Sequence, residues 1–145
     1  MILTINNIIL IAYVVIALVA SIQDIRTREI SDIVHILIIA ISILKLMMGI
    51  DIFNIIEKVI GAFIGATEFI LPNFVKKDGI GGADIKFMFA SGLLLGAEKI
   101  IMATIIGIIV VIIFAIFNKV ILKKNLEGIP LIPFLALGCI STFFI

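Results

Sequence analysis

Residues 100–117 read IIMATIIGIIVVIIFAIF, a run without a single charged side chain. A helix needs about 20 mostly apolar residues to cross roughly 30 Å of hydrocarbon, and this run approaches that length. Similar runs fill most of the remaining chain, at residues 2–22, 33–49, 52–71, 85–96 and 130–145. We therefore expect an all-α polytopic membrane protein with about six transmembrane helices, forming a single domain over residues 1–145.

The composition agrees with an integral membrane protein. Of the 145 residues, 63% are hydrophobic and 14% are charged, and the mean hydropathy is +1.42. Soluble domains carry about 25% charged residues, so a cytosolic enzyme and a disordered protein are both excluded. The net charge of +1 and the lack of a dense basic cluster exclude a nucleic-acid binder. Cys139 is the single cysteine, and no Cys or His pair has metal-ligand spacing, so we expect no metal and no cofactor.

Two other interpretations of the apolar runs are weaker. Strands of a membrane barrel would alternate apolar and polar residues over about ten positions, and no such alternation occurs. A cleaved signal peptide is the rival interpretation of residues 2–22, but no Lys or Arg precedes that run and it exceeds a usual signal core. Helices that all cross the bilayer remain the expectation.

Six crossings place the basic residues unevenly. One side then receives Arg26, Arg28, Lys76, Lys77, Lys86, Lys119, Lys123 and Lys124, and the other receives Lys45, Lys58 and Lys99. Because positive charges favour the inner side of the membrane, the larger set is expected to be cytoplasmic, with both termini outside. The expected location is the plasma membrane, with multiple crossings.

Two cytoplasmic segments have unusual polar content. Residues 23–32 read QDIRTREISD, and residues 78–86 read DGIGGADIK. Each segment places an aspartate at the end of an apolar helix, Asp24 after the first and Asp84 before the fourth. The simplest alternative for Asp24 is an ion pair with a neighbouring arginine, and for Asp84 it is an N-cap that accepts a backbone amide.

The residues before Asp84 are small. Gly81, Gly82 and Ala83 form a loop almost free of side chains, which allows unusual backbone angles or the close approach of another backbone. The helix expected over residues 85–96 would rise only about 18 Å, less than the hydrocarbon thickness. We therefore expect Asp84 to lie below the membrane surface, where ionisable groups usually serve a function.

Two aspartates at one side of the bundle could meet. Carboxylates within a few ångströms cannot both ionise, so the pair shares a proton. The ionised member can act as a general base on water while the protonated member polarises a peptide carbonyl. This is the chemistry of an aspartic protease, which needs neither a metal nor a nucleophilic side chain.

Together, the two segments resemble a known family. Asp24 with its basic turn and the following Ile-Ser-Asp resembles the first aspartate motif of type IV prepilin peptidases, and residues 79–86 (GIGGADIK) resemble their second, the Gly-x-Gly-Asp motif. Residues 129–138 (IPLIPFLALG) resemble the proline-containing start of the family's last helix.

The resemblance implies a six-helix aspartic endopeptidase that acts at the cytoplasmic membrane face. It would remove the short basic leader from type IV prepilin-like precursors: pilins, pseudopilins or preflagellins. Asp24 and Asp84 would be the catalytic pair. Gly81, Gly82 and Ala83 would shape the loop that presents Asp84, with Lys86 as a neighbour without an assigned role. The implied partners are the precursor and the lipid bilayer.

The chain departs from the family pattern at two points. Ala83 replaces the second glycine of the motif, which is acceptable if its φ is negative and costly if it is positive. Longer members carry a cytoplasmic domain with paired cysteines and also methylate the new amino terminus. We therefore expect peptidase activity without methyltransferase activity, as in the short forms that serve preflagellins and tight-adherence or competence pili.

Other functions remain open at this stage. A small proton- or cation-coupled transporter would explain a buried Asp84 beside a glycine-rich helix start. A non-catalytic scaffold would reduce the aspartates to caps and ion pairs. Among other polar residues, we expect His35 to make a hydrogen bond at a helix surface. We expect Glu68 to reach water near the cytoplasmic end of its helix or to line the catalytic cavity. Gly61 and Gly65 predict close packing of the third helix.

Overall fold

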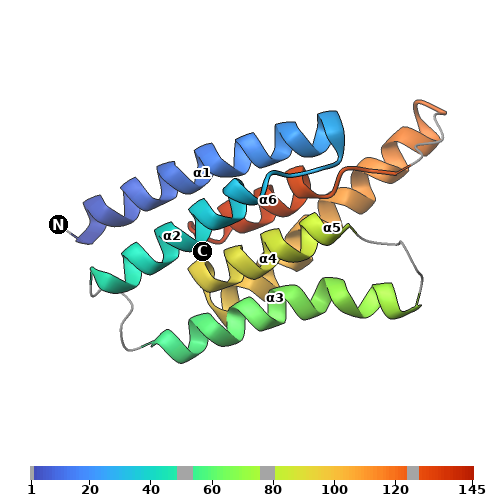
Figure 1. The fold of residues 1–145 in the computed structure, drawn as a ribbon. Coiled ribbons are helices and arrows are strands. Elements are labelled where there is room, and N and C mark those ends of the chain that lie inside the picture. Colours follow the sequence, from blue (N-terminus) through green and yellow to red (C-terminus); the bar gives the residue numbers. More distant parts are fainter. Residues whose placement is uncertain (1, 49–53, 76–80, 124–127) are drawn as a thin grey trace.

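The computed structural model describes residues 2–48, 54–75, 81–123 and 128–145. These ranges contain six α-helices and no strand (Figure 1). The helices are α1 (Ile2–Thr27), α2 (Asp32–Met47), α3 (Ile55–Val75), α4 (Gly82–Leu95), α5 (Ala97–Val120) and α6 (Ile132–Ser141). Two of them, over Thr4–Thr27 and Ala97–Val120, are long and apolar enough to cross a membrane. The all-helical fold class is therefore confirmed.

The helix ends differ from the apolar runs in the sequence. α1 continues five residues beyond the expected end at Ile22, and α4 begins three residues before the expected start at Ile85. The reason is that hydropathy marks where apolar side chains stop, whereas a helix can begin before and continue beyond them through small and polar residues. As a result, Asp24 and Asp84 both lie inside helices and not beyond their ends. Four residues named in the sequence analysis lie outside the described residues: Gly79 of the second motif, Lys76, Lys77 and Lys124.

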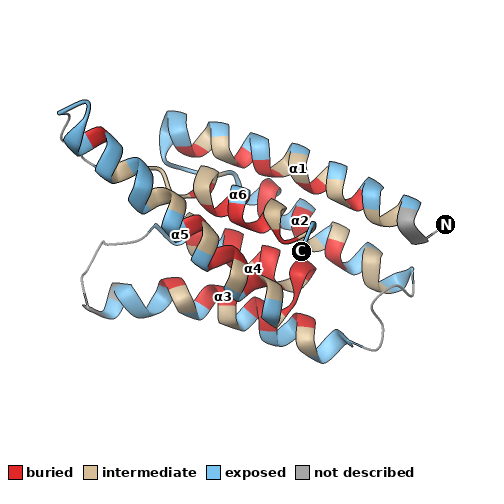
Figure 2. Ribbon diagram, turned by 180° about the vertical axis from the view of Figure 1, so that it is seen from behind, coloured by how far each residue is buried: buried red, intermediate tan, exposed pale blue. Residues whose placement is uncertain are grey.

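α4 lies at the centre of the bundle. It has α2 on one side and α3 on the other, and it also packs against α5 and α6 (Figure 1). α1 packs on the outside of this group, against α2 and α6. Figure 2 shows buried residues concentrated on α4 and α6, whereas α1, α3 and α5 keep long exposed faces. Most of the exposed large side chains there are Ile, Leu, Val and Phe.

Glycines allow α3 and α4 to pack backbone against backbone. A Cβ atom added to Gly61 would lie 2.5 Å from the carbonyl carbon of Gly96, and one added to Gly65 would lie 2.5 Å from the carbonyl oxygen of Met88. A Cβ on Gly92 would collide with the carbonyl oxygen of Gly61. The close packing predicted from the spacing of Gly61 and Gly65 is therefore confirmed.

Three lysines surround a pocket of ≈ 250 Å³ at the end of the bundle away from Asp84. They are Lys45 near the end of α2, Lys58 in α3 and Lys99 in α5. This grouping agrees with the smaller of the two sets of basic residues found in the sequence. Lys58 is buried, and its Nζ donates hydrogen bonds to the carbonyls of Leu94 (3.2 Å) and Leu95 (2.9 Å). Its charge therefore stabilises the C-terminus of α4, where carbonyl groups lack helical partners.

Candidate active site

Asp24 lies in the last turn of α1 and continues the buried face of that helix. Tyr13, Ala17 and Ala20 precede it on this face, at helical spacing, and all three are fully buried. The side chain of Asp24 is only 7% exposed, and its Oδ2 accepts a hydrogen bond from the backbone N–H of Ile132 (3.0 Å). Asp24 is therefore directed into the bundle by the same periodicity that buries the apolar residues before it.

The partner of Asp24 is the first residue of α6. A carboxylate at the C-terminus of its own helix is destabilised by the helix dipole, by a few tenths to about 1 kcal/mol. The N-terminus of α6 offers the opposite end of a dipole and a backbone amide without a helical partner. The contact joins residues 108 positions apart, and it links the first motif to the proline-containing third stretch. Nothing in the residues around Asp24 predicts Ile132 as its hydrogen-bond donor.

Asp84 lies in the first turn of α4 and is 8% exposed. The alternative interpretation of Asp84 as the N-cap is wrong, because Gly81 occupies that position. Asp84 is the third residue of the helix, and its Oδ2 accepts a hydrogen bond from the N–H of Gly81 (3.2 Å). A carboxylate that bonds back in this way stabilises the helix start. It also holds the Asp84 side chain in one orientation.

The two aspartates interact electrostatically although they are 60 positions apart in the chain. Burial raises the pKa of Asp84, the negative charge of Asp24 raises it further, and the hydrogen bond from Gly81 lowers it, giving a value of about 6. A repulsion between like charges of this kind requires that the carboxyl groups lie near each other. Near neutral pH, Asp84 therefore holds a proton more tightly than an exposed aspartate does.

The loop before Asp84 has ordinary backbone geometry in its described part. Gly81 is extended, with φ −68° and ψ 144°. Among the described non-glycine residues, only Arg28 and Lys123 have positive φ, so Ala83 meets the condition under which its methyl group is acceptable. A Cβ on Gly82 would meet nothing within 4 Å, whereas one on Gly81 would lie 3.3 Å from Asp84 Oδ2. Unusual backbone angles are therefore not the reason for small residues at these three positions, and only Gly81 leaves room for the carboxylate.

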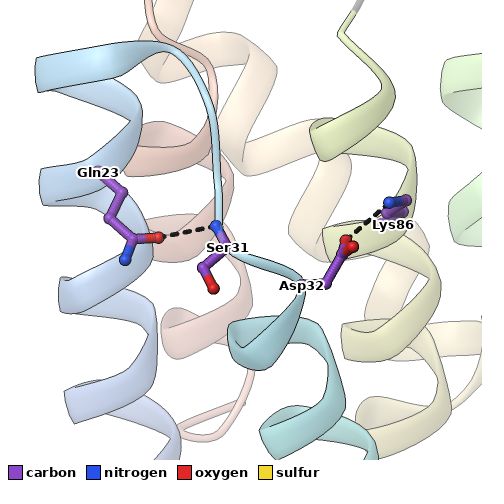
Figure 3. A network of polar contacts seen from close by, with 4 residues as sticks. All are labelled: Gln23, Ser31, Asp32 and Lys86. Atoms are coloured by element: carbon purple, nitrogen blue, oxygen red, sulfur yellow. Dashed lines mark hydrogen bonds and ion pairs between the residues drawn. The ribbon is translucent and has the colours of Figure 1, made fainter.

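Lys86 and Asp32 connect the second turn of α4 to the start of α2. The Nζ of Lys86 lies 2.7 Å from Asp32 Oδ1, and the two side chains are 58% and 71% exposed (Figure 3). Lys86 lowers the pKa of Asp32 through this hydrogen bond and its charge. Exposed ion pairs usually contribute at most about 1 kcal/mol, so this pair orients two helix ends more than it stabilises the fold. The sequence singled out Lys86 but not this partner.

The turn between α1 and α2 is held by hydrogen bonds to groups outside α2. Ser31 is the N-cap of α2, but its hydroxyl makes no capping bond. Its backbone N–H instead donates to Oε1 of Gln23 (3.0 Å; Figure 3). Arg28 has φ 56°, and its Nη2 donates to the carbonyl of Gly128 (3.0 Å). The basic turn therefore contacts the segment that leads into α6, the same helix that binds Asp24.

Two further polar residues singled out in the sequence are Glu68, which is half-buried, and His35. Glu68 lies seven residues before the end of α3, and its Oε2 accepts a hydrogen bond from Thr104 Oγ1 of α5 (2.6 Å), so it is bonded between helices. His35 is 5% exposed, and neither of its ring nitrogens has a hydrogen-bond partner in the part of the chain that the structure describes. The expected surface hydrogen bond of His35 is therefore wrong. Within the described ranges, no three His, Cys, Asp or Glu side chains are grouped to hold a metal ion.

The sequence was compared with protein families, with curated proteins and with solved structures. A model of the type IV leader peptidase family matches residues 11–116, which include α2, α3 and α4 and both aspartates. No curated protein and no solved structure matches the chain.

Proposed function

The chain belongs to the type IV leader peptidase family, and on that premise we propose that it is a membrane-embedded aspartic endopeptidase. Its substrates are type IV prepilin-like precursors, which consist of a short basic leader joined to an apolar helix. Asp24 and Asp84 are the proposed catalytic pair, and the peptide bond is cut at the cytoplasmic face of the plasma membrane. The proposed activity is hydrolysis of the peptide bond, without methylation of the new amino terminus.

One observation carries the proposal: two buried carboxyl groups from distant helices interact at the same end of the bundle. Asp24 is 7% exposed and Asp84 is 8% exposed. The charge of Asp24 contributes to the raised pKa of Asp84, which is about 6. Aspartates that serve only as exposed caps or surface ion pairs would be solvated and would not repel each other in this way.

The arrangement supports a division of roles within the pair. The N–H of Ile132 donates to Asp24, and the start of α6 favours a negative charge at this position. Asp24 is the proposed general base, which takes a proton from water as the oxygen adds to the peptide carbonyl carbon. Asp84 is the proposed acid, which gives its proton to the carbonyl oxygen. As the C–N bond breaks, Asp24 gives its proton to the leaving amine, and Asp84 takes a proton back from a hydroxyl group of the tetrahedral intermediate, which leaves a carboxylic acid product and restores the pair.

The surface of the molecule supports a bilayer environment. The exposed faces of α1, α3 and α5 consist largely of Ile, Leu, Val and Phe, far more apolar area than a soluble monomer usually exposes. We propose that all six helices cross or enter the membrane. With 14 residues, α4 rises only about 21 Å, which is shorter than the hydrocarbon layer. Asp84 therefore lies at the inner edge of the lipid, where the start of a membrane-embedded substrate helix can reach it.

Cleavage of a co-expressed precursor tests the proposal. The precursor should carry a basic leader and an apolar helix, and processing is followed as a mobility shift together with the sequence of the new amino terminus. We expect Asp24→Asn and Asp84→Asn each to abolish cleavage while the protein still inserts. Asp32→Asn is the matched control, because this exposed carboxylate lies at the same end of the bundle and should not be essential. Full cleavage by either catalytic variant would refute the proposed pair.

The purified protein, reconstituted into vesicles with precursor, distinguishes a peptidase from a transporter. A transporter would leave every precursor intact and would show a proton- or cation-dependent flux. We expect cleavage and no such flux.

A further inference from the structure

Arg28 ends α1 in a backbone conformation that usually belongs to glycine. Its φ is 56°, and its N–H donates to the carbonyl of Asp24 (3.0 Å), four residues earlier. The left-handed residue that closes a helix in this way is commonly Gly or Asn, because most side chains strain the backbone there. Strain of this kind is typical of functional sites. The contacts of the Arg28 side chain explain why an arginine stands at this position.

The guanidinium of Arg28 holds the segment that leads into α6. Its Nη2 donates to the carbonyl of Gly128 (3.0 Å), across 100 positions of the chain. Gly128 has φ +71°, and a Cβ atom added there would lie 2.5 Å from Arg28 Nη1. The guanidinium therefore packs directly on the backbone of Gly128, at a position where glycine leaves room for it.

The same segment supplies the hydrogen bond to Asp24. Ile132 is the first residue of α6, four positions beyond Gly128, and its N–H donates to Asp24 Oδ2 (3.0 Å). Arg28 lies one helical turn beyond Asp24, so two contacts side by side join the end of α1 to the start of α6. Pro130 restricts the backbone between Gly128 and Ile132. Fixing Gly128 therefore limits where the N–H of Ile132 can lie.

Arg28 also acts on Asp24 through its charge. The guanidinium interacts electrostatically with the carboxyl group of Asp24. A cation beside a carboxyl group favours its ionised form. The ionised form is the one that can take a proton from water as a general base.

We propose that Arg28 is a positioning residue for the general base: it holds the start of α6 so that the N–H of Ile132 meets Asp24, and its charge keeps that carboxylate ionised. The inference rests on the proposed function and adds a residue outside the catalytic pair. Arg28 acts through Asp24 and α6 and not on the substrate. It therefore helps to decide which of the two aspartates serves as the base.

Matched arginine variants test this role. Arg26 and Arg28 are both exposed and lie two residues apart, so Arg26→Gln and Arg28→Gln remove the same charge from the same end of α1. We expect Arg28→Gln to lower kcat about tenfold with KM little changed. The acidic limb of its pH–rate profile should move upward by about half a pH unit. Arg28→Lys keeps the charge and should restore the acidic limb, and Arg26→Gln should behave as the wild type.

Two results of these assays would count against the inference. If Arg28→Gln matches Arg26→Gln in kcat and in pH profile, while the wild type cleaves, the inference is overturned and the proposed function stands. If Arg28→Lys leaves the acidic limb where Arg28→Gln leaves it, the role of the charge is overturned.

Arg28→Gly separates positioning from folding. Glycine suits a φ of 56° and keeps the backbone hydrogen bond to Asp24, so the unfolding midpoint should not fall. We expect kcat to fall as it does in Arg28→Gln, because the side chain is lost. A lower unfolding midpoint in Arg28→Gly, with kcat at the wild-type value, would overturn the inference.

Hydrogen exchange tests the contact without cleavage. Exchange of the Ile132 N–H is followed by NMR in the full-length protein in detergent. We expect this amide to exchange about tenfold faster in Arg28→Gln and at the wild-type rate in Arg26→Gln. Equal rates in all three proteins would overturn the positioning of α6 by Arg28. If the exchange is as expected but the wild type cleaves no precursor, the proposed function is overturned and Arg28 is a structural contact only.

Discussion

The closeness of α3 and α4 at Gly65 leads to a quantitative prediction for Gly65→Ala. The added Cβ would lie 2.5 Å from the carbonyl oxygen of Met88, 3.0 Å from its carbonyl carbon and 3.2 Å from Ile100 Cγ1. Ordinary contact begins near 3.4 Å, so the two helices must separate by about 1 Å. Overpacking of this kind costs about 1–3 kcal/mol. We expect the free energy of unfolding to fall by that amount.

The same displacement should impair catalysis. Met88 lies one helical turn beyond Asp84, so a shift of its backbone carries the start of α4 with it. A misplacement of about 1 Å at a catalytic group can lower the rate about a hundredfold. We therefore expect Gly65→Ala to lose most of its cleavage activity while the protein remains inserted and folded at low temperature.

Gly82→Ala is the matched control for this change. Its Cβ would meet nothing within 4 Å, and alanine has a better helix propensity at this first position of α4. Unfolding midpoints in mild detergent and initial rates of precursor cleavage are measured for both variants and the wild type. The packing of α3 on α4 would be refuted if Gly65→Ala unfolded like Gly82→Ala and cleaved at the wild-type rate.

Three other predictions concern titration and buried polar contacts. The folded-state pKa of Asp84 is about 6 and the usual value is 3.8, so the free energy of unfolding should fall as the pH rises through this interval. The value of kcat/KM should also fall as the pH rises through about 6. In Asp84→Asn, the unfolding midpoint should lose this pH dependence; a wild type with no such dependence would contradict the raised pKa. Tyr13→Phe removes a buried 2.9 Å hydrogen bond to Ser91 and should lower the free energy of unfolding by about 1–2 kcal/mol, measured in denaturant. Lys58→Met leaves two carbonyls at the end of α4 without this donor and should cost about 1–3 kcal/mol in the same assay, whereas an unchanged midpoint would show that the cap is unimportant.

The helical class and the positions of the helices could be predicted from hydropathy, because long apolar runs leave few alternatives in a chain of this composition. The charge pattern predicted the grouping of Lys45, Lys58 and Lys99 at one end of the bundle. The spacing of Gly61 and Gly65 predicted a close helix contact, because only small residues allow two backbones to approach. Each of these features depends on local sequence.

Contacts between distant segments were not predictable in the same way. The bond from Ile132 to Asp24 depends on where α6 begins, and nothing in the residues around Asp24 specifies that position. One signal was available for the orientation of Asp24: it continues the buried face that contains Tyr13, Ala17 and Ala20, provided that the helix extends past residue 22. The burial of His35 had no such signal, because a single polar residue in an apolar helix can face lipid, protein or a groove.

The convergence of Asp24 and Asp84 at one end of the bundle is the central claim, and chemical cross-linking of a double cysteine variant tests it most directly. Asp24→Cys combined with Asp84→Cys is treated with a short bifunctional thiol reagent in membranes. The native Cys139 is fully buried, and each single variant measures its background reaction. Asp24→Cys combined with Lys99→Cys is the negative control, because Lys99 lies at the other end of the bundle. We predict an intramolecular link between positions 24 and 84 and none between positions 24 and 99. Efficient linking of the control pair, or none between positions 24 and 84, would contradict the account.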